Sequence, residues 1–473
     1  MRLLLVAICF VFLAPSLFAQ SAPPAQPAPP PSRPNILFVF IDDMGCRDLS
    51  CFGGTRVKTA EIDRLAAEGL RFNQFYVSAP ICSPSRVAVL TGQYPNRWRI
   101  TSFLAKREED AQRGIADWLD PKAPSLARSL QQAGYYTAHV GKWHMGGQRD
   151  VADAPPITDY GFATSVTNFE GLGPRILPKF EKVKHGPTEM SAKFGGPGVQ
   201  WEARDKVSQR FVDRAIAEID VAQKKKQPFY INLWPDDVHS PCEAPADLRG
   251  DGSPSAQYLG VLKELDKQLG RVFEHVRATP ALRDNTLIVL ASDNGHERGF
   301  GSAGSLRGSK GQLYEGGIRS PLIVWGPGRL AASAKPGTIN ERTLIAGIDL
   351  APSLLAVAGV NADQTIKYDG RNMSAAMLGK SSEPRDGKVM WVRPPDRPGP
   401  PNQPLPDLAI REGDLKLLVR RDGSNAELFD IAKDPDEKNN LAASHADVAK
   451  RLGDAVIAWD RSIQPKATSG NQK

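Results

Sequence analysis

Cysteine is scarce in this sequence, with five residues in a chain of 473. Cys9 lies in an apolar N-terminal run, which leaves Cys46, Cys51, Cys82 and Cys242 for the folded part. Four cysteines cannot hold a fold of this size together through disulfides, so the chain must bury a conventional hydrophobic core. Cys46 and Cys51 are near enough in sequence to pair, but the sequence leaves that pairing open.

The sequence also lacks a block of lysine and arginine interleaved with aromatic residues, which argues against nucleic acid as a partner. The formal net charge is +7. A mild basic excess is compatible with an anionic substrate, although it does not say where the charges lie. The length predicts one large domain together with a smaller one.

Long apolar runs are missing, apart from the run Leu3 to Leu13, which follows Arg2 and precedes small residues. This pattern predicts a secretory signal peptide over residues 1–20, because the run is too short for a stable membrane anchor. Residues 21–34 are dominated by proline and alanine and predict an extended linker. The protein is therefore expected to be secreted or periplasmic, with its fold beginning near Asn35.

Apolar runs of strand length alternate with helical patterns through most of the chain. The runs with the continuous hydrophobicity of buried parallel strands are Ile36 to Ile41, Tyr135 to Val140, Phe229 to Trp234 and Leu287 to Ala291. Their alternation with helices predicts an α/β fold, with a mostly parallel sheet sandwiched by helices, over residues 35–370.

The character of the sequence changes after about Gly370. Three short strand patterns precede a helical stretch from Ser444 to Ile463, for which Ser444 is the expected N-cap. Residues 371–473 are therefore expected to form a smaller subdomain with an antiparallel sheet. Segments 168–198 and 394–406 are rich in glycine or proline and predict long loops, which are either functional or mobile.

Polar residues stand where several of the buried strands end, and in parallel sheets ligands bind at that edge. They are Asp42, Asp43, Lys142, His144, His239, Asp293 and Asn294. Adjacent carboxylates need a counter-charge. A solvated turn could satisfy Asp42 and Asp43 alone, but with Asp293 and Asn294 converging on them the better account is a hard cation with oxygen ligands.

The segment Cys82-Ser83-Pro84-Ser85-Arg86, followed by Leu90-Thr91-Gly92, places a cysteine just ahead of a predicted helix. A helix N-terminus and the cation of Arg86, one turn on, both favour negative charge at Cys82. A semi-buried cysteine at a turn is the plainer interpretation of this segment taken alone.

The segment resembles the signature of the type I sulfatases, which belong to the alkaline phosphatase superfamily. Further segments resemble the same family: Gly134-Tyr135 with Gly141-Lys142-Trp143-His144, Ser292 to Gly295, Arg307 to Pro321, and Glu427 to Leu441. The resemblance runs from about Pro34 to Leu441. The sequence departs from the family pattern at Cys46, where an aromatic residue is common, and at Val238, where proline is common.

The resemblance implies that a formylglycine-generating maturation enzyme oxidises Cys82 to formylglycine, whose hydrated aldehyde is the nucleophile. It implies a Ca²⁺ ion, with Mg²⁺ as the alternative, and assigns roles to the remaining site residues. The implied metal ligands are Asp42, Asp43, Asp293, Asn294 and the modified Cys82. In the implied catalytic set Lys142 and Lys310 bind sulfate, His144 hydrogen-bonds the hydrate, His239 donates to the sulfate or the leaving oxygen, and Arg86 orients the formylglycine.

The resemblance thus implies a sulfuric ester hydrolase of the arylsulfatase kind, whose expected substrates are sulfated carbohydrates. Two alternatives stay open at this point. Related enzymes of the superfamily hydrolyse phosphonate or phosphate esters with the same cysteine motif, and a non-catalytic glycan-binding relative would keep the fold without the modification. The sequence does not define the sugar, the position of its sulfate, or exo versus endo action.

Overall fold

The computed structural model describes residues 33–168, 170–181, 187–194, 198–361 and 363–463. The predicted signal peptide, and the predicted linker up to residue 32, lie outside the described residues. From Arg33 onward the chain belongs to one compact unit. Within the described ranges, none of the helices has both the length and the apolarity needed to span a membrane.

The main sheet contains nine strands in the order β10-β2-β9-β8-β1-β7-β3-β4, with β11 also paired to β2. Its strands are β1 Asn35–Ile41, β2 Leu70–Tyr76, β3 Tyr136–Gly141, β4 Thr164–Val166, β7 Phe229–Trp234, β8 Thr286–Ser292, β9 Arg319–Trp325, β10 Thr338–Asn340 and β11 Ile345–Ala346. Only β9 runs antiparallel to its neighbours β2 and β8. The predicted mostly parallel sheet is therefore confirmed.

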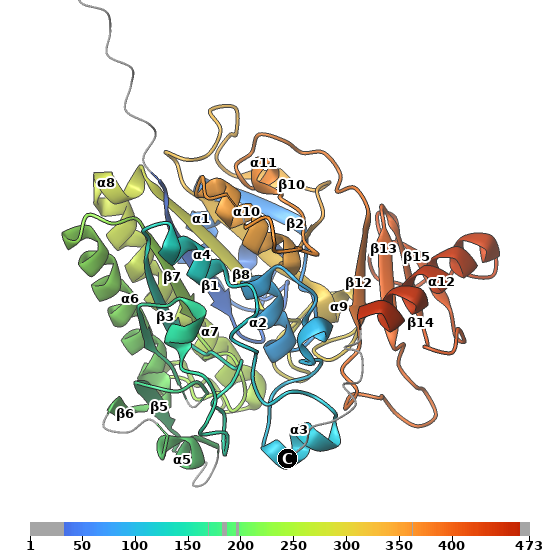
Figure 1. Cartoon of the computed structure of the whole chain (residues 1–473), viewed down its shortest axis with the longest axis horizontal. Helices are drawn as coiled ribbons and strands as arrows, with labels where there is room; N and C mark the ends of the chain where they lie inside the picture. The colour runs from blue at the N-terminus through green and yellow to red at the C-terminus, as the bar shows by residue number, and fades with distance from the viewer. Residues whose placement is uncertain (1–32, 169, 182–186, 195–197, 362, 464–473) are drawn as a thin grey trace, which may run out of the picture. The chain divides into compact units, whose positions relative to one another are not determined.

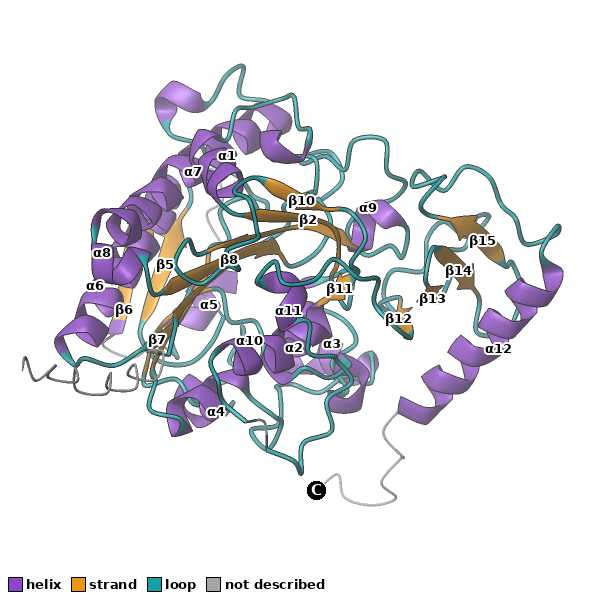
Figure 2. Cartoon of the chain, turned by 90° about the horizontal axis from the view of Figure 1, so that it is seen from above, coloured by secondary structure: helices purple, strands orange, loops and turns teal. Residues whose placement is uncertain are grey.

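Helices cover both faces of this sheet, as Figure 2 shows from above. Alternate side chains of β1 enter different cores: Ile36, Phe38 and Phe40 pack with one group of helices, and their neighbours in sequence pack with the other. The first group contains α2 Cys82–Thr91, α4 Leu126–Gln132 and α10 Leu350–Val357, and the second contains α1 Ala60–Glu68, α6 Val207–Lys224 and α7 Pro254–Ala278. A strand buried on both faces explains the continuous apolar runs in the sequence.

The shorter elements connect these layers. The short α-helices are α3 Arg107–Gln112, α5 Pro187–Ala192, α8 Pro280–Arg283, α9 Glu315–Ile318 and α11 Ser374–Met377, and the 3₁₀ turns are η1 Ser50–Phe52, η2 Pro95–Trp98, η3 Ile157–Tyr160, η5 Arg204–Lys206, η6 Ala246–Leu248 and η7 Gly347–Asp349. In the part of the chain that the structure describes, the four cysteines are free thiols, so Cys46 and Cys51 do not pair.

A separate antiparallel sheet forms near the C-terminus, coloured orange to red in Figure 1. Its strands are β12 Lys388–Val392, β13 Leu408–Glu412, β14 Leu415–Val419 and β15 Glu427–Asp430, and α12 Ala446–Ile463 packs on it. The predicted small antiparallel sheet with a terminal helix is confirmed. The predicted N-cap is wrong, because α12 begins at Ala446 and the Ser444 hydroxyl donates to the carbonyl of Leu441.

The two predicted loops differ in outcome. Segment 168–198 is not simply a loop, because it contains β5 Arg175–Lys179 and α5. Strand β5 pairs in parallel with β6 Val199–Ala203, a partner that lies beyond the glycine-rich stretch. Segment 394–406 contains neither a helix nor a strand, as predicted.

Candidate active site

Three carboxylates meet where two neighbouring strands of the main sheet end. Strands β1 and β8 pair in parallel with Ile41 opposite Ser292, so the residues that follow them leave the sheet side by side. Carboxylate oxygens of Asp42, Asp43 and Asp293 all lie within 4.8 Å of one another, and the three side chains are fully buried. The pairs at 42–43 and 293–294 therefore converge on one place.

This group of oxygen donors fits a hard divalent cation. Burial, and after it the neighbouring charge of Asp42, raise the pKa of Asp293 well above its ordinary value. The Asn294 amide nitrogen donates to Asp43 (2.7 Å), and its buried Oδ1 has no hydrogen-bond partner among the described residues. Carboxylate and amide oxygens are the donors that Ca²⁺ and Mg²⁺ prefer.

Cys82 is the first residue of α2, rather than a loop residue ahead of it. Its side chain is buried. Burial alone would raise the pKa of the thiol, but Lys142 and His144 together lower it to about 7. This environment stabilises a negatively charged or strongly polar side chain at position 82.

Arg86 ties α2 to the carboxylates. Its guanidinium donates to Asp293 (2.6 Å), to Asp42 (3.2 Å) and to the backbone carbonyl of Lys142 (3.0 Å), and none of it is exposed. One turn of helix separates Arg86 from Cys82, so these bonds also fix the direction in which Cys82 points.

Lys142 and His144 reach the site from the turn that follows β3. The strand ends at Gly141, and His144 has a positive φ of 52°. The Lys142 ammonium lies 2.8 Å from Asp42. His144 Nδ1 lies 2.9 Å from Glu170 Oε2, and its Nε2 lies 3.0 Å from the carbonyl of Leu104.

His239 and Lys310 form the solvent side of the site. Lys310 Nζ lies 2.6 Å from Asp43 Oδ2, and His239 Nε2 lies 3.7 Å from the same oxygen. Their side chains are 12% and 29% exposed, whereas the other predicted site residues are buried. All the predicted site residues are thus gathered in one region, and it is open towards His239 and Lys310.

Sequence reasoning missed the residues that support the two histidines. Glu170 contacts His144, and Arg204 contacts both the carboxylate (3.1 Å) and the carbonyl of Asp236, three residues before His239. Asn168 donates to the same carboxylate (2.8 Å). Glu170 and Asn168 lie in the glycine-rich segment, where no spacing or periodicity marks a polar residue as functional.

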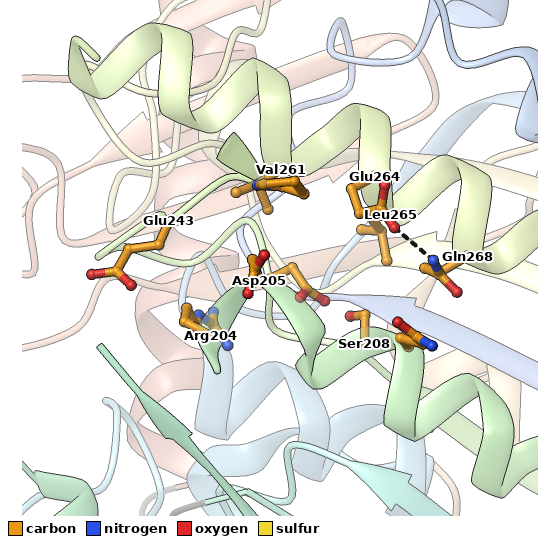
Figure 3. A pocket seen from close by; sticks show the side chains of 11 residues that line it. Arg204, Asp205, Ser208, Glu243, Val261, Glu264, Leu265 and Gln268 are labelled. Atoms are coloured by element: carbon orange, nitrogen blue, oxygen red, sulfur yellow. Dashed lines mark hydrogen bonds between the residues drawn. The ribbon is translucent and has the colours of Figure 1, made fainter. Parts of the chain in front are cut away.

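A small pocket lies between η5, the start of α6, and α7 (Figure 3). Its lining includes Arg204, Ser208, Asp237, Glu264 and Gln268, and none of the predicted site residues. Asp237 Oδ2 and Ser208 Oγ are buried and have no hydrogen-bond partner within the described ranges. Burial raises the pKa of Asp237 to about 7, so this carboxyl holds a proton more readily than an exposed one.

Fold and site together define a class of protein. A parallel α/β sheet presents a buried set of oxygen donors, a cysteine of lowered pKa and several cations at its carboxyl edge. Such an arrangement serves a hydrolase that acts on an anionic ester, because the cations can neutralise the charge of the group under attack.

Comparisons with known proteins agree with this class. A family model described as Sulfatase matches residues 34–360, and one described as N-sulphoglucosamine sulphohydrolase, C-terminal, matches residues 309–460. The chain belongs to the sulfatase family, and it is a sulfuric ester hydrolase. Members of this family carry a cysteine-derived formylglycine and a divalent metal ion.

Individual relatives are similar over most of their length. The chain is 29% identical to N-acetylgalactosamine-6-O-sulfatase of Bacteroides thetaiotaomicron, over 90% of this chain and 92% of the relative. It is 30% identical to human arylsulfatase A, over 86% and 83% of the two chains. A solved structure titled Ps i-CgsB in complex with k-i-k-neocarrahexaose superposes with a TM-score of 0.76 at 25% identity, covering 92% of this chain and 94% of that one.

Proposed function

We propose that this sulfatase removes sulfate groups from sulfated carbohydrates and uses a formylglycine formed from Cys82. The observation that carries the proposal is the position of Cys82 at the start of α2. It lies beside Lys142 and His144, and Arg86 on the same helix bonds the carboxylates of Asp42 and Asp293. The names of the relatives support the substrate class, because the bacterial relative is called an N-acetylgalactosamine-6-O-sulfatase.

Ca²⁺ is the proposed ion, held by Asp42, Asp43, Asp293, Asn294 and the modified Cys82, with Mg²⁺ as the alternative. Bound there, the ion would supply positive charge against the sulfate oxygens and acidify a hydroxyl of the formylglycine hydrate. The hydrate would supply the oxygen nucleophile that a thiol does not offer.

The chain's own residues then divide the remaining work. With the carboxylates engaged by a cation, the ammonium groups of Lys142 and Lys310 are available to the sulfate oxygens, and their charge lowers the repulsion that an incoming nucleophile meets. His239 lies at the open side, where the alcohol must leave, and can protonate the leaving oxygen. His144, which Glu170 holds in its charged form, can donate a hydrogen bond to a hydroxyl of the hydrate.

The proposal includes the route by which the protein matures. Cys82 needs a formylglycine-generating enzyme, and the apolar run at the N-terminus directs the chain to secretion or the periplasm. Hydrolysis of phosphonate or phosphate esters is not favoured, because the similar curated relatives are named as sulfatases.

The test is to express the protein with and without a formylglycine-generating enzyme, and to examine the Cys82 peptide by mass spectrometry. We expect an aldehyde at Cys82 and turnover of aryl sulfates and sulfated saccharides only in the first preparation. Cys82→Ala should have no turnover and a normal melting temperature, and Cys242→Ala, a second free cysteine, should keep both. Full turnover by protein with an unmodified Cys82 thiol, or a dominant aryl phosphonatase activity, would contradict the proposal.

A further inference from the structure

The exposure of the site residues fixes the side on which a substrate's alcohol part must lie. The carboxylates, Cys82, Arg86, Lys142 and His144 are buried, whereas Lys310 and His239 are partly exposed. A sulfate group bound at the carboxylates therefore directs its alcohol past Lys310 and His239 towards solvent. Side chains beside these two residues are placed to contact the saccharide.

The proline-rich loop 394–406 brings Arg397 to this side. The Arg397 Cγ lies 3.2 Å from the position that a Cβ on Gly311 would occupy, and Gly311 directly follows Lys310. The Arg397 guanidinium carbon lies 5.4 Å from the centre of the Phe103 ring. The next residue, Leu104, donates its amide to the Ser83 hydroxyl (3.0 Å), beside Cys82. Arg397 thus rests on two segments that both adjoin the site.

The backbone around Arg397 is held in place. Asp396 accepts hydrogen bonds from the Ser102 hydroxyl (2.7 Å) and from Arg113 (3.0 Å). The carbonyl of Arg397 accepts a hydrogen bond from Arg393 (2.5 Å), and its amide donates to the carbonyl of Pro394 (3.1 Å). A loop fixed on both sides of one residue presents that side chain with little ordering left to do on binding.

The charge of Arg397 is available, in contrast to that of its neighbour. Arg113 lies over the same Phe103 ring (4.6 Å), but it is paired with Asp110 and Asp396. Arg397 is exposed and makes no ion pair within the described ranges. A guanidinium supported on an aromatic face, with its donors free, matches a carboxylate or a sulfate in a two-point contact.

We propose that Arg397 forms a subsite for a second anionic group of the saccharide, a carboxylate or a second sulfate, distinct from the sulfate that is removed. The inference rests on the proposed action on sulfated carbohydrates and narrows it to saccharides with at least two negative charges. The hydrolysed sulfate lies beside the buried carboxylates, at Lys142 and Lys310. The second anionic group lies on the solvent side of Lys310, at the guanidinium of Arg397.

The test compares matched substrates. Mature wild-type protein and Arg397→Gln are assayed on an aryl sulfate and on galactosamine and glucosamine disaccharides of three kinds: with one sulfate, with one sulfate and one carboxylate, and with two sulfates. Arg397→Gln should lose about tenfold in kcat/KM on the doubly charged disaccharides, mainly through KM, and change by less than about twofold on the singly charged ones. The carboxylate and disulfate arms distinguish the two sources of the anion.

Two controls accompany this comparison. Arg461→Gln removes the same charge from an exposed position on α12 and should leave every substrate unchanged. Arg397→Lys keeps the charge without the planar fork and should recover part of the loss. An equal loss on singly and doubly charged disaccharides, or no loss, would overturn the subsite while leaving the proposed function in place. Wild-type turnover of the aryl sulfate but of no saccharide would instead overturn the proposed function itself.

Discussion

Glu170 Oε2 lies 2.9 Å from His144 Nδ1, and both side chains are buried. Burial alone would disfavour both charges, but each residue stabilises the charge of the other. The charges of Glu170 and Cys82 raise the pKa of His144 to about 9, while His144 and Lys142 lower the pKa of Glu170 to about 2. Glu170 therefore sets both the direction and the charge of the His144 ring.

Glu170→Gln should lower kcat by about 10- to 100-fold and change KM little, because an amide can contact the ring without stabilising its charge. Steady-state kinetics on an aryl sulfate measure both parameters. Glu202→Gln makes the same change at a half-buried residue of β6 that pairs with Arg210 (2.7 Å), and it should leave kcat and KM unchanged. A normal kcat in Glu170→Gln, or a loss explained by a fall in melting temperature, would leave Glu170 without a role in the reaction.

Removal of divalent cations should abolish activity and lower the melting temperature. Without an ion, the three buried carboxylates of Asp42, Asp43 and Asp293 lie close together and repel one another. An ion present at about one hundred times its dissociation constant stabilises the native state by roughly 2.7 kcal/mol. Melting curves recorded after exhaustive chelation, and then with added Ca²⁺ or Mg²⁺, identify the preferred ion. Asn294→Ala should reduce the rise in melting temperature that the added ion produces. A melting temperature that does not change in chelator would count against the metal site.

Asp237→Asn should change the pH dependence of stability. Burial raises the pKa of Asp237 from 3.8 to about 7, so the native state favours the protonated acid. The contribution of protonated Asp237 to the free energy of unfolding is fully present below pH 3.8 and is lost as the pH rises through about 7. This contribution is at most roughly 4 kcal/mol. Relative to wild type, the variant should therefore gain stability between pH 4 and pH 8 in denaturant titrations. Parallel curves for the two proteins would show that Asp237 is not the titrating group.

Lys416→Met should destabilise the protein by about 3–5 kcal/mol, because it removes the cation that lies between two buried carboxylates. The Lys416 ammonium lies 3.0 Å from Glu315 and 2.8 Å from Glu437, and all three side chains are buried. The contacts join β14 of the C-terminal sheet to α9, which follows the Lys310 loop.

The matched control is Lys433→Met, at a position that is 85% exposed, where little change is expected. Adding Glu437→Gln to Lys416→Met should recover part of the loss, since one buried charge is then removed. Urea denaturation of the four proteins measures these differences. Equal effects of the two lysine substitutions would show that the buried pairs contribute nothing specific.

Much of the fold could be predicted because buried parallel strands leave a direct mark in sequence. The run Phe229 to Trp234 coincides with β7, and the run Leu287 to Ala291 lies within β8. Both elements owe their pattern to burial, which acts residue by residue. The Ser444 cap was mispredicted because the choice of first helical residue depends on packing against the C-terminal sheet.

The site was predictable only in part. Asp42 and Asp293 each follow an apolar run, so the sequence placed them at strand ends, but that those strands are neighbours is a matter of sheet order. The approach of Lys142 and His144 depends on a turn of positive φ, which the sequence did not signal. Glu170 and Arg397 come from segments with no periodicity at all.

The sequence by itself determined the sulfatase motifs, the alternation of strands with helices and the residue types available for catalysis, because hydrophobic pattern and local spacing are properties of neighbours along the chain. Tertiary structure alone decided which ends of strands meet, which carboxylate supports His144, and which cation is left free at the open side. Those outcomes depend on contacts between residues far apart in sequence, such as Glu170 with His144 and Arg397 with Phe103. Each requires the complete packing of the fold before it can form.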